Sequence, residues 1–203
     1  MKKLLLSLAA SVVVVAADAQ SYTYSIARHR EKYKLEFIEE ERSPLKGEDT
    51  SFLRFYKADP RYRVVAALKL TPEAKPFDIP TSSGKKKSYR KYGELSFRLN
   101  KKPYKLELYQ SIDLMTKEKY KDHLFVPFND LTNYQGTYAG GRYIDLSLKD
   151  IKNNVVILDF NKAYNPYCAY ASGYNCPIPP RANNLKVAIK AGEKMYGKEV
   201  AGH

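Results

Sequence analysis

The sequence of 203 residues contains no tryptophan, three methionines and only two cysteines, and this cysteine count excludes a disulfide-dense small scaffold. It lacks a phosphate-binding GxxxxGK loop, a GxGxxG dinucleotide motif and the GxSxG turn of serine hydrolases. Its three histidines form no HExxH motif, and no paired CxxC accompanies them. The sequence therefore predicts no metal ion and no cofactor, and it leaves open whether the protein is an enzyme.

The chain also lacks a membrane-spanning run, because its longest apolar stretch, residues 4–17, is shorter than the roughly 20 residues that a span needs. Lys2 and Lys3 precede this stretch, and small residues occupy the −3 and −1 positions of residues 17–19. The pattern is typical of a secretory signal peptide, residues 1–19, cleaved before Gln20. We therefore expect a soluble exported protein, periplasmic or secreted, with no transmembrane segment.

Positive charge is abundant but unevenly distributed. The formal net charge is +13, and residues 51–110 alone hold 15 basic and 5 acidic side chains. Five cations lie within residues 84–92, namely Lys85, Lys86, Lys87, Arg90 and Lys91. For an exported protein, this basic surface indicates an anionic glycan, lipopolysaccharide or a membrane surface as partner, and makes nucleic acid unlikely. A solvated loop or a lysine-protected edge strand is the alternative.

Hydrophobic periodicity predicts a helix followed by strands. Ile26, Tyr33 and Phe37 fall near one face of a helix over residues 24–41, within an N-terminal helical unit of residues 20–45. From residue 52 the period is two, which predicts strands at residues 62–69, 94–99, 104–109, 124–128, 143–148, 155–160 and 185–190, with a short helix in 112–122. Residues 46–203 are therefore expected to form one mainly β domain, an antiparallel sandwich or barrel-like body.

Residues 159–184 form a long irregular loop that is too rich in proline, tyrosine and asparagine for regular structure. Loops held on a rigid sheet often carry binding or catalysis. The alternative is an irregular crossover that its aromatic side chains fix to the core. Both cysteines lie here, and in an oxidising compartment Cys168 and Cys176 are expected to form a disulfide. The alternatives are a metal-bound thiol, or a reactive thiol beside His29 or His123.

Residues 140–145 are a second candidate segment, because two glycines there permit unusual backbone angles and precede an arginine. Arg142 could present its guanidinium to a carboxylate or phosphate of a ligand. The alternative is a structural ion pair with Asp145 or Asp159. Since Asp159 ends an apolar strand, its carboxylate needs a partner, and we expect that partner to be Arg142.

Several short motifs together resemble the DUF1684 family, in the form of an exported Bacteroidetes-type member. The resemblance covers about residues 52–194 and rests on Pro-Thr-Ser at 80–82, residues 125–128, 137–143, 159–161 and 165–170, Cys-Pro at 176–177, Pro-Pro at 179–180, Asn183, and Ala-Gly-Glu-Lys at 191–194. The family brings no activity, substrate or cofactor. It implies that the signature residues cluster in the two segments above, where they would form either one polar site or a structural network.

Three functions follow as hypotheses. The first is a non-enzymatic binding module for a sugar or an acidic small molecule or glycan, with its ligand held by Arg142, Tyr143, Asn161, Tyr164, Asn165 and Tyr170. The second is a hydrolase-like enzyme whose acid/base groups are Asp159, Glu193 and His123, with Arg142 beside them. The third is a structural or partner-binding protein that uses the basic surface. The oligomeric state is not predicted.

Overall fold

The computed structural model describes the backbone of residues 2–200 and the side chains of residues 20–200. A long N-terminal helix, α1, precedes one sheet. The longer elements are α1 (Lys2–Glu39), β1 (Arg63–Leu70), β2 (Phe77–Pro80), β3 (Lys86–Leu99), β4 (Lys102–Ser111), α2 (Ile112–Met115), β5 (His123–Phe128), β6 (Arg142–Ser147) and β7 (Val155–Asp159). Three-residue 3-10 turns include η3 (Glu118–Tyr120) after α2, η4 (Leu148–Asp150) after β6 and η5 (Phe160–Lys162) after β7.

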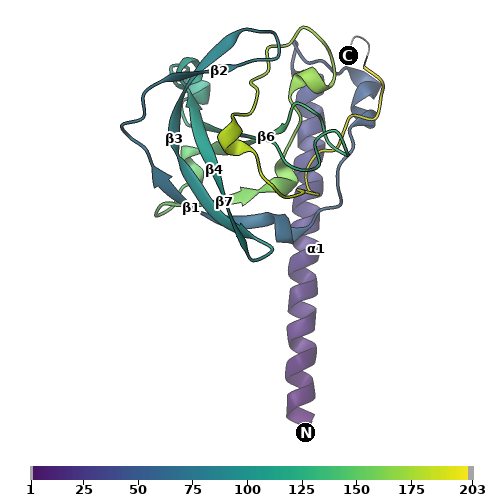
Figure 1. Cartoon of the computed structure of the whole chain (residues 1–203). Coiled ribbons are helices and arrows are strands. Elements are labelled where there is room, and N and C mark those ends of the chain that lie inside the picture. The colour runs from purple at the N-terminus through teal and green to yellow at the C-terminus, as the bar shows by residue number, and fades with distance from the viewer. Residues whose placement is uncertain (1, 201–203) are drawn as a thin grey trace.

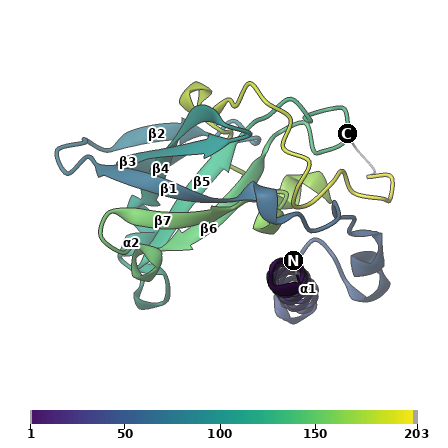
Figure 2. The ribbon, with the colours of Figure 1, turned by 90° about the horizontal axis from the view of Figure 1, so that it is seen from below.

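The strands form a single antiparallel sheet in the order β6-β5-β4-β3-β1-β7, with β2 paired to the start of β3. The sheet curls strongly, so that it resembles a half-barrel (Figures 1 and 2). The mainly β prediction is confirmed, and of its two architectures the barrel-like one is correct. A tight turn at Asn100 and Lys101, both with positive φ of 50° and 66°, joins β3 to β4 as the twist of a hairpin requires.

Alternation along the strands separates a main core from an outer aromatic cluster. The side chains that face the inside of the curl are buried leucine, valine and phenylalanine residues, including Leu95, Leu106, Leu124 and Leu158. Burying each such side chain contributes roughly 1.5–3 kcal/mol. The opposite face of β3 to β6 carries a tyrosine-rich cluster of Ile79, Tyr89, Tyr109, Phe125 and Tyr143, against which Tyr164 packs.

Two predicted elements differ from the structure. Residues 185–190 form no strand: they follow an irregular path and bond only singly to residues 129–131, although Leu185 and Ile189 are buried as a strand pattern would have them. The basic segment 84–92 is neither a loop nor an edge strand, because it belongs largely to β3, which β2 and β1 flank on one side and β4 on the other. Its lysines and serines are polar at successive positions, so the segment shows no alternation of apolar and polar residues that would predict a strand.

Helix α1 packs on the body through its C-terminal half, and its N-terminal half projects away from the sheet (Figure 1). Ile26 and Phe37 are its most buried side chains, and Phe37 joins a cluster with Leu45, Leu53 and Tyr170. The helix ends at Glu39, six residues before the predicted boundary of the helical unit. Within the described residues, no helix holds an apolar stretch long enough to cross a membrane. The side chains of the expected signal peptide, residues 1–19, lie outside the described ones.

Candidate functional site

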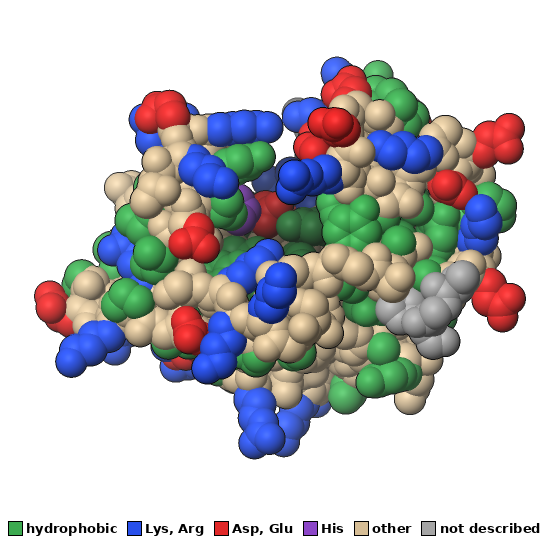
Figure 3. All heavy atoms as spheres, turned by 90° about the horizontal axis from the view of Figure 1, so that it is seen from above, with side chains coloured by type: hydrophobic (Ala, Val, Ile, Leu, Met, Phe, Trp, Pro, Cys, Tyr) green, Lys and Arg blue, Asp and Glu red, His purple; other side chains and the backbone are tan. Residues whose placement is uncertain are grey.

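A cavity of about 630 Å³ lies between α1 and the outer face of β6, and we name it the α1 cavity. Its walls come from α1, from η3, from β6 and from residues 161–167 of the irregular loop. Viewed from above, the surface is hollowed beside the end of α1, with a histidine and an acidic side chain in the hollow and lysine or arginine around it (Figure 3). The cavity therefore joins parts of the chain that are more than 100 residues apart.

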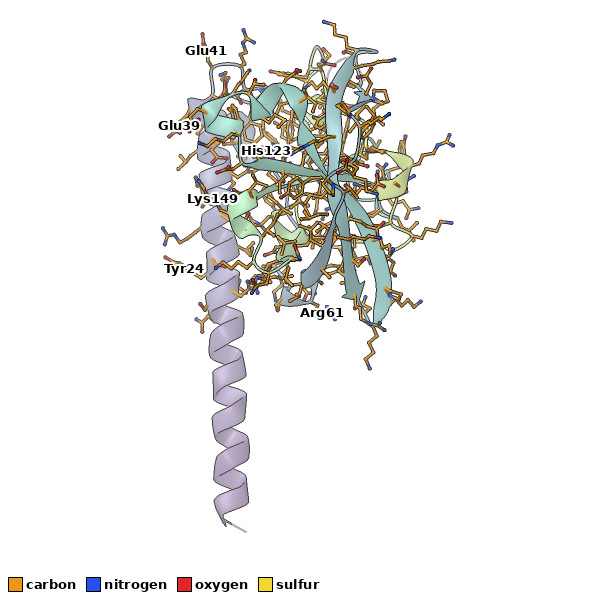
Figure 4. All side chains as sticks on the ribbon, turned by 90° about the vertical axis from the view of Figure 1, so that its left-hand side faces the viewer. Tyr24, Glu39, Glu41, Arg61, His123 and Lys149 are labelled. Carbon is orange, nitrogen blue, oxygen red and sulfur yellow. A yellow bond between two sulfur atoms is a disulfide. The ribbon has the colours of Figure 1, made fainter. Side chains whose placement is uncertain are left out.

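Asp145 is the carboxylate in the cavity that links two strands and the irregular loop. Because Ile144 faces the core, alternation turns Asp145 outward on β6. Its Oδ1 lies 2.9 Å from Nε2 of His123, a diagonal neighbour on β5, and its Oδ2 accepts a hydrogen bond of 2.8 Å from the Tyr164 hydroxyl. Burial raises the pKa of Tyr164 well above its usual range, so this tyrosine remains a donor. In Figure 4, His123 projects from the sheet on the side of α1.

Glu193 lies beneath the cavity and is fully buried. It accepts hydrogen bonds from the Tyr170 hydroxyl at 2.6 Å, from the backbone N–H of Asn165 at 2.8 Å, and from the Tyr33 hydroxyl at 3.2 Å. Burial outweighs these donors and raises the pKa of Glu193 to about 7. Gly192 precedes it with a φ of +75°, and a Cβ there would lie 2.6 Å from two backbone oxygens. Glu193 therefore holds the C-terminal segment to the irregular loop and to α1.

Arg142 is also fully buried, and its partner is Asp130. Its Nη2 lies 2.7 Å from Oδ2 of Asp130 and donates to the carbonyl of Ile189, while Nη1 donates to the carbonyls of Ala191 and Glu193. The prediction that Arg142 pairs with Asp145 or Asp159 is wrong, because the guanidinium points under the C-terminal segment. This ion pair connects the loop at 130 to residues 189–193, which the sequence separates by about 60 positions.

Asp159 forms a third network at the end of β7. The Tyr22 hydroxyl donates to its carboxylate at 2.9 Å, and the backbone and side chain of Asn161 each donate to it at 3.0 Å. The amide oxygen of Asn161 in turn accepts the backbone N–H of Asp59 at 2.9 Å. Asp159 is buried, and it fixes α1 to the turn that follows β7.

The predicted site residues therefore divide among separate networks and do not line one open site. Of them, Asn161 and Tyr164 line the α1 cavity, and His123 reaches its Asp145. Three others are buried beneath the surface and donate within the fold: Tyr143 to the carbonyl of Pro177, the amide nitrogen of Asn165 to that of Lys194, and Tyr170 to Glu193. The amide oxygen of Asn165 is buried without a hydrogen-bond partner among the described residues. The sequence analysis did not predict that α1 lines the cavity. The polar and aromatic residues along one stripe of residues 29–40 could have indicated it.

The five cations of the basic surface do not converge on one point. Arg90 donates to the amide of Gln110, Lys91 pairs with Glu107, and Lys86 lies 3.9 Å from Asp78. Lys87 is half-buried, and burial lowers its pKa. Only part of this charge is free for a partner, so an anionic surface partner stays a prediction.

Cys168 and Cys176 lie at disulfide distance, with their Cα atoms 6.3 Å apart, in the loop that supplies Tyr167 to the cavity. Among residues 20–200, no three histidine, cysteine or acidic side chains group closely enough to hold a metal ion.

Fold and cavity together define a curled antiparallel sheet with a helix laid across its outer face and a cavity between them. The chain belongs to the DUF1684 family, whose description is "protein of unknown function" and whose profile matches residues 50–194. The solution NMR structure of an uncharacterised protein of Haloarcula marismortui is similar, with a TM-score of 0.67 and 33% identity over 88% of this chain and 96% of that one. No curated protein shows significant similarity to the sequence.

Proposed function

We propose that the protein is a binding module that holds a small sugar-like ligand in the α1 cavity. The observation that supports this most directly is the lining, which combines aromatic rings with charged and amide side chains in one concave space. Its volume of about 630 Å³ lies within the range of roughly 300–1,000 Å³ typical of small-molecule sites.

The rings of the cavity hold one another in place. Tyr33 packs edge-on against Phe37 and Phe55, with ring centroids 4.9 and 6.3 Å apart, and Phe37 contacts Tyr167 at 5.6 Å. Such rings offer flat apolar faces on which the C–H face of a sugar packs, at a low cost in side-chain entropy. Asp145 supplies acceptors for hydroxyl groups, and its carboxylate is already oriented by hydrogen bonds to His123 and Tyr164.

Saturation-transfer NMR with a panel of neutral and acidic mono- and disaccharides tests this proposal. Tyr120 lines the cavity on η3 and is 37% exposed, so Tyr120→Ala should weaken binding without unfolding the protein. Tyr24→Ala is the matched control, because Tyr24 is 66% exposed and points away from the body in Figure 4. If no sugar gives a transfer signal, or if both variants bind like the wild type, the α1 cavity is not a sugar site.

A hydrolase-like activity is the second candidate, and the structure favours a different acid/base group from those first considered. Asp159 and Glu193 are buried in hydrogen-bond networks, whereas the side chain of Asp145 is 46% exposed, contacts His123 and lines the cavity. A carboxylate beside a histidine is suited to moving a proton. The test is hydrolysis of a glycoside that binds in the cavity. If Asp145→Asn abolishes hydrolysis but the glycoside still binds, the activity is established.

Export is part of the proposal. The basic, apolar and small-residue order of residues 1–19 supports it, as does the close cysteine pair, because disulfides persist in oxidising compartments. Among the described side chains of α1, that of Tyr22 bonds to the body through Asp159, and cleavage before Gln20 would retain this contact. N-terminal sequencing of secreted protein should read from Gln20, and an intact Met1 in the exported fraction would contradict the assignment.

A further inference from the structure

We infer that one end of the α1 cavity is a subsite for an anionic group, a carboxylate or a phosphate, formed by His29, Arg30 and Lys162. This inference rests on the proposed function, since it names the class of ligand that the same cavity would select. All three side chains line the cavity, two from adjacent positions of α1 and one from η5 at the end of β7.

The three side chains lie near one another, and two of them, Arg30 and Lys162, carry the positive charge. Within the described part of the chain, none of the three forms an ion pair within 4.0 Å. The charge of Asp159 acts on His29 and Arg30, but its oxygens accept hydrogen bonds from Tyr22 and Asn161 and not from these side chains. Burial, followed by the charge of Lys162, lowers the pKa of His29, so His29 would offer a neutral N–H donor. A bound anion would pair directly with Arg30 and Lys162.

Arg30 is held in a fixed orientation. Its Nη2 donates to the carbonyl of Tyr56 at 2.9 Å, and the guanidinium lies over the ring of Phe55 at 4.8 Å. Its Nε is buried against the protein, so a ligand would meet the guanidinium through its outer N–H groups. An oriented guanidinium is suited to a planar or tetrahedral oxyanion, because little side-chain entropy remains to be lost on binding.

Charge on the helical wall of the cavity changes sign along α1, while Asp145 on β6 and Lys119 on η3 line the opposite wall. His29 and Glu36 are both on α1 and seven residues apart, which corresponds to about 10 Å along a helix. Glu36 and Glu40 line the other end, and the rings of Tyr33 and Phe37 lie between the two ends on the helix. The cavity therefore fits a ligand with an acidic group at one end and a hydroxylated ring in the middle, such as a sugar acid or a sugar phosphate.

Amide-detected NMR titrations at constant ionic strength test the subsite, with inorganic phosphate, glucuronate and glucose as probes. Phosphate and glucuronate should shift the signals of residues 29, 30 and 162. Lys162→Gln should weaken their binding by about tenfold, the loss expected for one charged hydrogen bond. Lys162→Arg should retain binding. Lys75→Gln, which removes an exposed lysine of the loop between β1 and β2, should change nothing.

The outcomes separate the two proposals. Suppose that glucose binds in the cavity at least as tightly as glucuronate, and that Lys162→Gln leaves both affinities unchanged. This result would overturn the anionic subsite but not the binding module. Phosphate shifts that spread over many surface lysines, or that Lys75→Gln reduces equally, would also overturn it. If none of the three probes perturbs residues of the cavity, both proposals fail.

Discussion

The buried carboxyl of Glu193 makes the stability of this protein depend on pH in an unusual direction. Burial raises its pKa from 4.5 to about 7, so the folded state holds a proton that the unfolded state releases. A group of this kind stabilises the fold fully below its unfolded pKa, and its contribution is lost as the pH rises through the folded value. The free energy of unfolding should therefore fall between about pH 4.5 and pH 7.

The size of the effect follows from the shift. At 1.36 kcal/mol for each pKa unit, the move from 4.5 to about 7 corresponds to about 3 kcal/mol. Glu193→Gln removes this ionisation and keeps an acceptor for the Tyr170 hydroxyl, which donates at 2.6 Å in the wild type. The variant should be less stable than, or similar to, the wild type at pH 4.5, and it should gain on the wild type by about 3 kcal/mol by pH 8.

Urea unfolding of both proteins at several pH values between 4.5 and 8, at constant ionic strength, measures this difference. The subtraction cancels other titrations, including that of His29, whose lowered pKa acts in the opposite sense. Glu73→Gln, at an exposed position in a loop, is the control and should follow the wild type. A difference between the wild type and Glu193→Gln that stays constant with pH would refute the reasoning.

Two further predictions concern the other anchors of the fold. Arg142→Met should destabilise the protein by about 3–5 kcal/mol, because it leaves the carboxylate of Asp130 buried without its ion partner, and thermal or chemical unfolding would measure the loss. A loss below about 1 kcal/mol would show that the pair is not a main support. Reducing the Cys168–Cys176 pair, or replacing both with serine, should cost about 2.5 kcal/mol by the loop-entropy relation. Free thiols in native protein, counted by mass spectrometry without reductant, would contradict a disulfide.

The alternation of apolar residues was sufficient to predict most of the sheet. Strands β1, β5, β6 and β7 lie within a residue or two of their expected positions. One face of β1 and β7 is buried and gives a period of two, whereas β5 is buried on both faces and was found from its short apolar run. Strand β2 and the start of β3 were not predicted, since most of their residues are polar and each segment buries only one side chain, Ile79 and Tyr89. Residues 185–190 were predicted as a strand but form none. An irregular segment can bury alternate side chains, here Leu185 and Ile189, without the hydrogen bonds of a sheet.

The sequence by itself determined the class of the fold and most of its strands, and it indicated several of its buried polar residues. It could not determine which of them meet. Asp159 could pair with Arg142 as far as spacing shows, and the structure instead gives it Tyr22, from a helix 137 residues earlier. Periodicity reports only whether a side chain is buried, whereas the identity of its partner depends on how α1 and the irregular loop fold back on the sheet. The α1 cavity is a product of that packing, and tertiary structure alone placed His29, Arg30 and Lys162 on its wall.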